Sequence, residues 1–188
     1  MTDPRRPPDE AWREAAESGT RLLEGRQEVV RPSGAGGQTE SAVPAHASSL
    51  RSVAISRSLH AELLAWALAC RPNEACGLLA GDRPVASGGR ATRFLALRNA
   101  AESPYRYLMD PQEQLGAMLD LDEGDEVVWG IFHSHVASSA EPSVTDLGLA
   151  FYADSLYLIC SLADREPHVR AWTLSDGQAN EVLLRIAD

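Results

Sequence analysis

The sequence predicts one α/β domain over residues 51–188, preceded by a flexible or partly helical extension over residues 1–50. Its 188 residues, of which 44% are hydrophobic, suffice for one core of ordinary size and an appendage. After residue 51, short apolar runs typical of strands alternate with stretches that carry helix-start signals. Before it, clusters of Pro, Gly and Ser at residues 3–8 and 33–49 are typical of linkers.

The middle of the extension, residues 9–30, has a helical composition that two glycines interrupt. Isolated helices of this length are marginal in water, so we expect at most one weak helix, starting at an Asp9 cap. The Gly36-Gly37 pair resembles the end of a ubiquitin-like tail, but nothing before it has the strands that such a domain needs. We interpret the pair as linker and assign no chemistry to the extension.

The first half of the domain is predicted from caps, breakers and apolar runs. Ser58 can cap a helix over residues 59–70, and Pro72 ends it. Gly81 bounds a strand, which a Gly- and Pro-rich loop follows. Phe94 should point inward from the next strand. Strands are expected over residues 53–55, 75–80 and 90–97.

The second half of the domain contains one strong helix signal. Asp110 supplies an N-cap and Pro111 the first helical position, so a helix should run through about residue 121. A shorter helix is expected from Asp146 to Tyr152. Strands are expected over residues 105–109, 127–135, 156–161, 169–174 and 181–186, the last after an Asp-Gly turn.

The strand over residues 127–135 ends in a pair of histidines, His133 and His135. Side chains at positions i and i+2 of a strand point to the same face, so the two imidazoles should project side by side. Asp146 is the nearest candidate for a third ligand, because Ser143-x-x-Asp146 has the form of a capping box that would hold the carboxylate in a first helical turn. Two imidazoles and one carboxylate leave a fourth position for water, as in catalytic zinc sites.

The same residues allow other interpretations. A His-x-His pair can be two half-exposed strand residues, and Ser-x-x-Asp can be a plain helix cap. A set of two histidines and one carboxylate can also hold non-haem iron. Glu74, which opens an otherwise apolar segment, favours hydrolytic zinc chemistry. Unpaired glutamates are seldom buried, and this one would suit a general base acting on a metal-activated water.

Together, Glu74, His133-Ser-His135, seven further residues and Ser143-x-x-Asp146 resemble the signature of the JAMM (MPN+) metalloproteases. The resemblance covers the whole predicted domain. It implies that both histidines and Asp146 bind zinc, that Glu74 is the base and that Ser143 stabilises the tetrahedral intermediate. It also implies a mixed, curved, cytidine-deaminase-like sheet with helices packed on it.

Residues 99–107 and the acidic run before the histidine strand resemble the bacterial branch of this family, which includes enzymes that release cysteine from a sulfur-carrier protein. This implies hydrolysis of an (iso)peptide bond after the Gly-Gly tail of a ubiquitin-like or sulfur-carrier protein. Val136 departs from the family, since many members have Pro there, and this weakens the analogy with eukaryotic deubiquitinases. Only ten residues separate Asp146 from Tyr157, where members that cleave Lys-linked ubiquitin chains tend to carry a longer insertion. A small leaving group is therefore expected.

Three alternatives to a peptidase stay open: a non-catalytic scaffold of the same fold, a RadC-like protein linked to DNA repair, and an iron-dependent oxygenase. The order of the ligands disfavours the last, because such oxygenases usually have His-x-Asp and a distant His. The composition bears on the second, because the formal net charge is −10 and the sequence contains no Lys. Phosphate backbones and anionic membranes are bound through Lys and Arg, so we expect neither nucleic acid nor membrane as a partner. The sequence does not indicate an oligomeric state.

The three cysteines and the lack of an apolar signal segment favour a reducing cytoplasm. Five of the seven residues over 120–126 are acidic. This run can be a solvated turn between a helix and a strand, or a contact surface for a basic partner beside the histidine strand.

Overall fold

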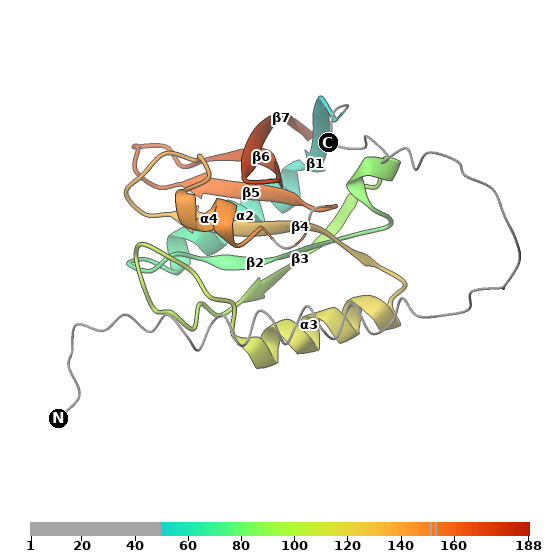
Figure 1. Cartoon of the computed structure of the whole chain (residues 1–188), viewed down its shortest axis with the longest axis horizontal. Helices are drawn as coiled ribbons and strands as arrows, with labels where there is room; N and C mark the ends of the chain where they lie inside the picture. The colour runs from blue at the N-terminus through green and yellow to red at the C-terminus, as the bar shows by residue number, and fades with distance from the viewer. Residues whose placement is uncertain (1–49, 151, 153) are drawn as a thin grey trace, which may run out of the picture. The chain divides into compact units, whose positions relative to one another are not determined.

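The computed structural model describes residues 50–150, 152 and 154–188 of the chain. The predicted extension lies outside these residues except for Leu50, and so do its weak helix and its Gly-Gly pair. The described residues form a seven-stranded sheet in the order β1-β7-β6-β5-β4-β2-β3 (Figure 1). The strands are β1 (Ser52–Ser56), β2 (Cys76–Gly81), β3 (Ala91–Leu97), β4 (Val127–His135), β5 (Leu156–Ser161), β6 (His168–Ser175) and β7 (Gln178–Ala187).

The sheet is mixed, as the family resemblance implied. The β1–β7 and β4–β5 pairs are parallel, whereas the other neighbours are antiparallel. A parallel pair needs a crossover connection between its strands. The crossover from β4 to β5 contains the short helix α4 (Val144–Gly148), so it leads from the histidine pair to Asp146.

Apolar side chains of the sheet build two core clusters. Neighbouring residues of β4 belong to different clusters, Ile131 to one and Phe132 to the other, as expected from the two-residue period of a strand. Helix α2 (Arg57–Ala69) contributes Leu63 to the cluster of Phe132. Helix α3 (Pro111–Glu123) contributes Ala117 to the other cluster. A 3₁₀ turn, η1 (Val85–Ser87), lies between β2 and β3.

The strand predictions are confirmed to within three residues at either end, with one exception. Residues 105–109 do not form a strand, so that prediction was wrong. Within this segment, only Met109 pairs in β fashion, through an isolated bridge to Asn99. The physical reason is that side-chain atoms of Asn99, rather than a neighbouring strand, bond to the backbone of Arg106 and Leu108.

The helix predictions need two corrections. Helix α2 begins after Ser56, whose hydroxyl accepts the Leu59 N–H at 3.1 Å, so the predicted cap Ser58 was wrong. Helix α4 ends at Gly148 instead of continuing to Tyr152. By contrast, Asp110 caps α3 as predicted. Among the described residues, no helix is both long enough and apolar enough to cross a membrane.

The acidic run between α3 and β4 is largely solvated. Its last member, Glu126, pairs with Arg93 of β3 at 2.7 Å, and Asp120 pairs with the same guanidinium at 2.8 Å. Glu126 and Asp120 are thus engaged within the protein. A contact with a basic partner stays a prediction for Asp122, Glu123 and Asp125.

Candidate metal centre

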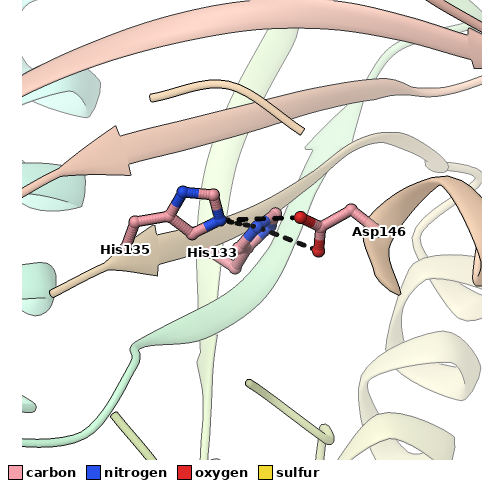
Figure 2. A group of neighbouring side chains, drawn as sticks. All are labelled: His133, His135 and Asp146. Atoms are coloured by element: carbon pink, nitrogen blue, oxygen red, sulfur yellow. Dashed lines mark hydrogen bonds and ion pairs between the residues drawn. The ribbon is translucent and has the colours of Figure 1, made fainter. Parts of the chain in front are cut away.

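Two imidazoles lie side by side at the end of β4. His133 is fully buried and His135 is 4% exposed, so neither is a half-exposed strand residue. Their Nε2 atoms are 3.1 Å apart, and their ring planes are tilted by 56°. Figure 2 shows both rings directed toward the carboxylate of Asp146, which enters from α4.

The Asp146 carboxylate completes a group of three metal-ligating side chains. Its Oδ1 lies 3.3 Å from His133 Nε2, and its Oδ2 lies 3.5 Å from His135 Nε2. A tetrahedral zinc ion with ligand bonds of about 2.0–2.1 Å separates its ligand atoms by about 3.3–3.4 Å. The observed separations are close to this value, with the two carboxylate distances measured to different oxygens of Asp146. The three side chains could therefore hold such an ion and leave a fourth position free. The donor set also suits non-haem iron.

Burial and mutual contacts shift the protonation of these groups. Burial alone would raise the pKa of Asp146, but hydrogen bonds from both histidines hold it well below its usual range. Burial lowers the pKa of His133. For His135, burial acts in the same direction, yet the Asp146 carboxylate and the Ser139 carbonyl raise the pKa overall. The shifts at Asp146 and His133 favour an ionised carboxylate and a neutral imidazole, which are the states in which these groups bind a metal.

Each histidine has a different environment around its second nitrogen. His135 Nδ1 lies 2.7 Å from the carbonyl oxygen of Ser139, which orients the ring and leaves Nε2 for a ligand bond. His133 Nδ1 is buried and has no hydrogen-bond partner among the described residues. The ring of Tyr107 stacks on His133 instead, with centroids 4.6 Å apart and planes at 24°. No local sequence pattern indicated this stacking.

Glu74 lies two residues before β2, and its side chain is buried at 4% exposure. Burial raises its pKa to about 7, although the nearby His135 acts in the opposite direction. The pairing of Cys76 with His133 across β2 and β4 places Glu74 on the same end of the sheet as the ligands. A carboxyl group that changes its protonation near neutral pH can both accept and return a proton.

Ser143 is the N-cap of α4 and forms the predicted capping box with Asp146. Its hydroxyl donates to Asp146 Oδ2 at 2.6 Å, so its only proton is directed at the carboxylate. The structure thus brings four of the five predicted site residues together, with Glu74 close enough for its charge to act on His135 and Asp146.

The loop over residues 136–142 joins the histidines to α4 and is fastened to β6. Trp172 Nε1 donates to the Ala140 carbonyl at 2.9 Å. Arg170 donates to Glu141 at 2.7 Å, and its guanidinium lies 4.6 Å from the Trp172 ring centroid. These contacts set the path of the chain between the ligands, and no local sequence pattern indicated them.

Residues 56–175 match the family of prokaryotic homologues of the JAB domain. The chain is 35% identical over 127 residues to the CysO-cysteine peptidase of Mycobacterium tuberculosis (strain ATCC 25618 / H37Rv), covering 67% of this chain and 85% of that protein. It is 33% identical over 103 residues to the desampylase of Haloferax volcanii, covering 54% of this chain and 71% of that protein.

A solution structure of a Desulfitobacterium hafniense protein has the same fold, with a TM-score of 0.64 and 36% identity. The match covers 72% of this chain and 92% of that chain. Since the family match extends over more than half of the sequence, this chain belongs to the prokaryotic homologues of the JAB domain.

Proposed function

We propose that this protein is a zinc peptidase that hydrolyses the (iso)peptide bond after the C-terminal Gly-Gly of a ubiquitin-like or sulfur-carrier protein, including a bond to cysteine. The observation that carries the proposal is the convergence of His133, His135 and Asp146 at separations that fit zinc, with the buried carboxyl of Glu74 nearby. Homology to a CysO-cysteine peptidase and to a desampylase supports the substrate class.

When bound by these three residues, zinc would lower the pKa of a water molecule at its open position and polarise the scissile carbonyl. Glu74 accepts the proton of that water on its carboxylate and returns it to the leaving amine. Its raised pKa, about 7, suits both transfers. Ser143 can donate to the developing oxyanion only after its hydroxyl turns away from Asp146 Oδ2.

The Gly-Gly tail suits this site because glycines let the substrate backbone approach the reacting atoms closely. On the leaving side, the connection between α4 and β5 is short, running from Leu149 to Ser155. This supports a small amine such as cysteine as the leaving group. We further propose a cytoplasmic location, which the three free cysteines support.

Intact-mass spectrometry of a sulfur-carrier protein that bears cysteine on its Gly-Gly carboxylate tests the proposal. Zinc-loaded wild type should remove the cysteine, and Glu74→Gln should be about 10²- to 10⁴-fold slower, because a general base is lost. Glu166→Gln, at an exposed position, is the matched control and should match wild type. Zinc content is measured for all three proteins.

A lysine-linked conjugate of the same carrier is the second substrate. Cleavage of this conjugate alone would keep the peptidase and change the leaving group. Zinc-loaded wild type that leaves both conjugates intact would contradict the proposed substrate. Failure to bind zinc would favour a non-catalytic scaffold.

A further inference from the structure

We propose that Asn99 is a positioning residue that fixes the general base Glu74 relative to the metal ligands, an inference that rests on the proposed function. Asn99 follows β3 and is 9% exposed. Its Nδ2 donates to the carbonyls of Glu74 at 3.0 Å and of Arg106 at 3.1 Å. Its Oδ1 accepts the N–H groups of Ala101 and Leu108, both at 3.0 Å. The amide thus makes all four of the bonds that its two donors and two acceptor sites allow.

The main chain of Glu74 is held from two directions. Its N–H donates to the Ser103 carbonyl at 2.9 Å, while its carbonyl accepts Asn99 Nδ2, so both bonds come from the loop over residues 99–109. The next residue, Ala75, is bonded to Ser134, which lies between the two histidines of β4. The place of Glu74 therefore depends on this loop on one side and on the histidine strand on the other.

The same amide also fixes the residue that stacks on a ligand. Arg106 and Leu108, which flank Tyr107, are both bonded to Asn99. Between these two anchored positions, the Tyr107 ring stacks on His133. One side chain thus connects the backbone of the base to the backbone of the aromatic ring that covers a metal ligand.

An asparagine that only shaped its loop would bond only within the loop. Here, one of the four bonds leaves the loop and holds the carbonyl of Glu74. Without that bond, the Glu74 main chain keeps Ser103 as its only anchor in the loop. A misplacement of about 1 Å in an active site can cost about 10²-fold in rate, so Asn99 should affect the step that Glu74 performs.

A double-mutant cycle tests this dependence. Asn99→Ala should lower kcat about 10- to 100-fold in the wild-type background. In the Glu74→Gln background, the same change should lower kcat by less than about twofold, because residues that act as one unit are not additive. Asn180→Ala, at an exposed position of β7, is the control and should alter neither rate. Equal losses in both backgrounds, or no loss in either, would overturn the proposal.

Asn99→Asp provides a second variant in case Asn99→Ala does not fold. It keeps both acceptor bonds and removes both donors. Measured on the plateau of the pH–rate profile, it should show the same dependence on Glu74. If Asn99→Asp lowered kcat equally in the wild-type and Glu74→Gln backgrounds, this result would also count against the proposed role.

Amide hydrogen exchange of the metal-free protein supplies a readout that needs neither substrate nor zinc. In Asn99→Ala, the amides of Glu74 and Leu108 should exchange about tenfold faster or more, because their anchoring loop opens locally. The amide of Ser134, which bonds to the Ala75 carbonyl, should keep its protection. An unchanged Glu74 amide would refute the role of Asn99 even if the wild-type protein were inactive, and inactivity of wild type would contradict only the proposed function.

Discussion

Ser143 and Asp146 hold each other through three hydrogen bonds. The hydroxyl and the N–H of Ser143 both donate to Asp146 Oδ2, at 2.6 and 2.7 Å, and the Asp146 N–H donates to Ser143 Oγ at 3.2 Å. These bonds leave Asp146 Oδ1 facing His133. The serine that the family resemblance implied as an oxyanion donor is therefore also the residue that orients a candidate metal ligand.

Ser143→Ala should weaken zinc binding as well as catalysis. Loss of the partner that orients a ligand typically costs about 10- to 100-fold in metal affinity. Competition with a chromophoric chelator measures that affinity. Ser143→Thr keeps the hydroxyl and is the matched control, with affinity close to wild type. A lower kcat with unchanged zinc affinity in Ser143→Ala would show that the hydroxyl acts on the substrate alone.

Trp172→Phe should loosen the loop that joins the histidines to Asp146. The change keeps an aromatic ring under Arg170 but removes the N–H that bonds to the Ala140 carbonyl. A buried carbonyl without a partner costs about 1–3 kcal/mol, so urea denaturation should show this loss. Zinc affinity should fall as well, because Ala140 lies between His135 and Asp146 in the chain.

Trp129→Phe is the matched control for this prediction. The Trp129 Nε1 donates to the Gly89 carbonyl at 2.9 Å, away from the loop over residues 136–142. We expect a comparable loss of stability with zinc affinity unchanged. If both tryptophan variants bound zinc equally tightly, the loop contact would have no part in holding the site.

Glu74→Gln should make the stability of the metal-free protein less sensitive to pH. Burial raises the pKa of Glu74 in the folded protein to about 7, above its usual value of 4.5. The stability that neutral Glu74 contributes is thus complete below about pH 4.5 and is lost as the pH rises through about 7. Glutamine stays neutral throughout, so the variant should gain stability over wild type between pH 5 and pH 8.

The size of this gain follows from the shift in pKa. One pKa unit corresponds to about 1.4 kcal/mol. The gain in unfolding free energy of Glu74→Gln over wild type should therefore approach about 3 kcal/mol at pH 8. Urea denaturation at both pH values measures it, with Glu166→Gln as the exposed control. If the difference in unfolding free energy between Glu74→Gln and wild type were the same at pH 5 and pH 8, the Glu74 carboxyl would be ionised in the folded protein at both pH values.

The sequence alone identified the family and the residues of the candidate site, because these depend on local spacing. The two-residue period of a strand places His133 beside His135, and the capping box places Asp146 in the first turn of α4. The mixed sheet implied by the resemblance and the cap of α3 at Asp110 are likewise found in the structure. The roles of the five site residues stay predictions that the experiments above address.

The tertiary structure decided how these residues are held. Residues 105–109 have the composition of a strand, yet their backbone is bonded to the side chain of Asn99. The same side chain also bonds to the carbonyl of Glu74, in another part of the chain. The stacking of Tyr107 on His133 and the bond from Trp172 to Ala140 join residues that are 26 and 32 positions apart. Such contacts depend on how loops meet across the sheet, whereas sequence patterns report only the geometry of single elements. The candidate ligands could thus be proposed from their spacing, but the side chains that hold them in place emerged only from the fold.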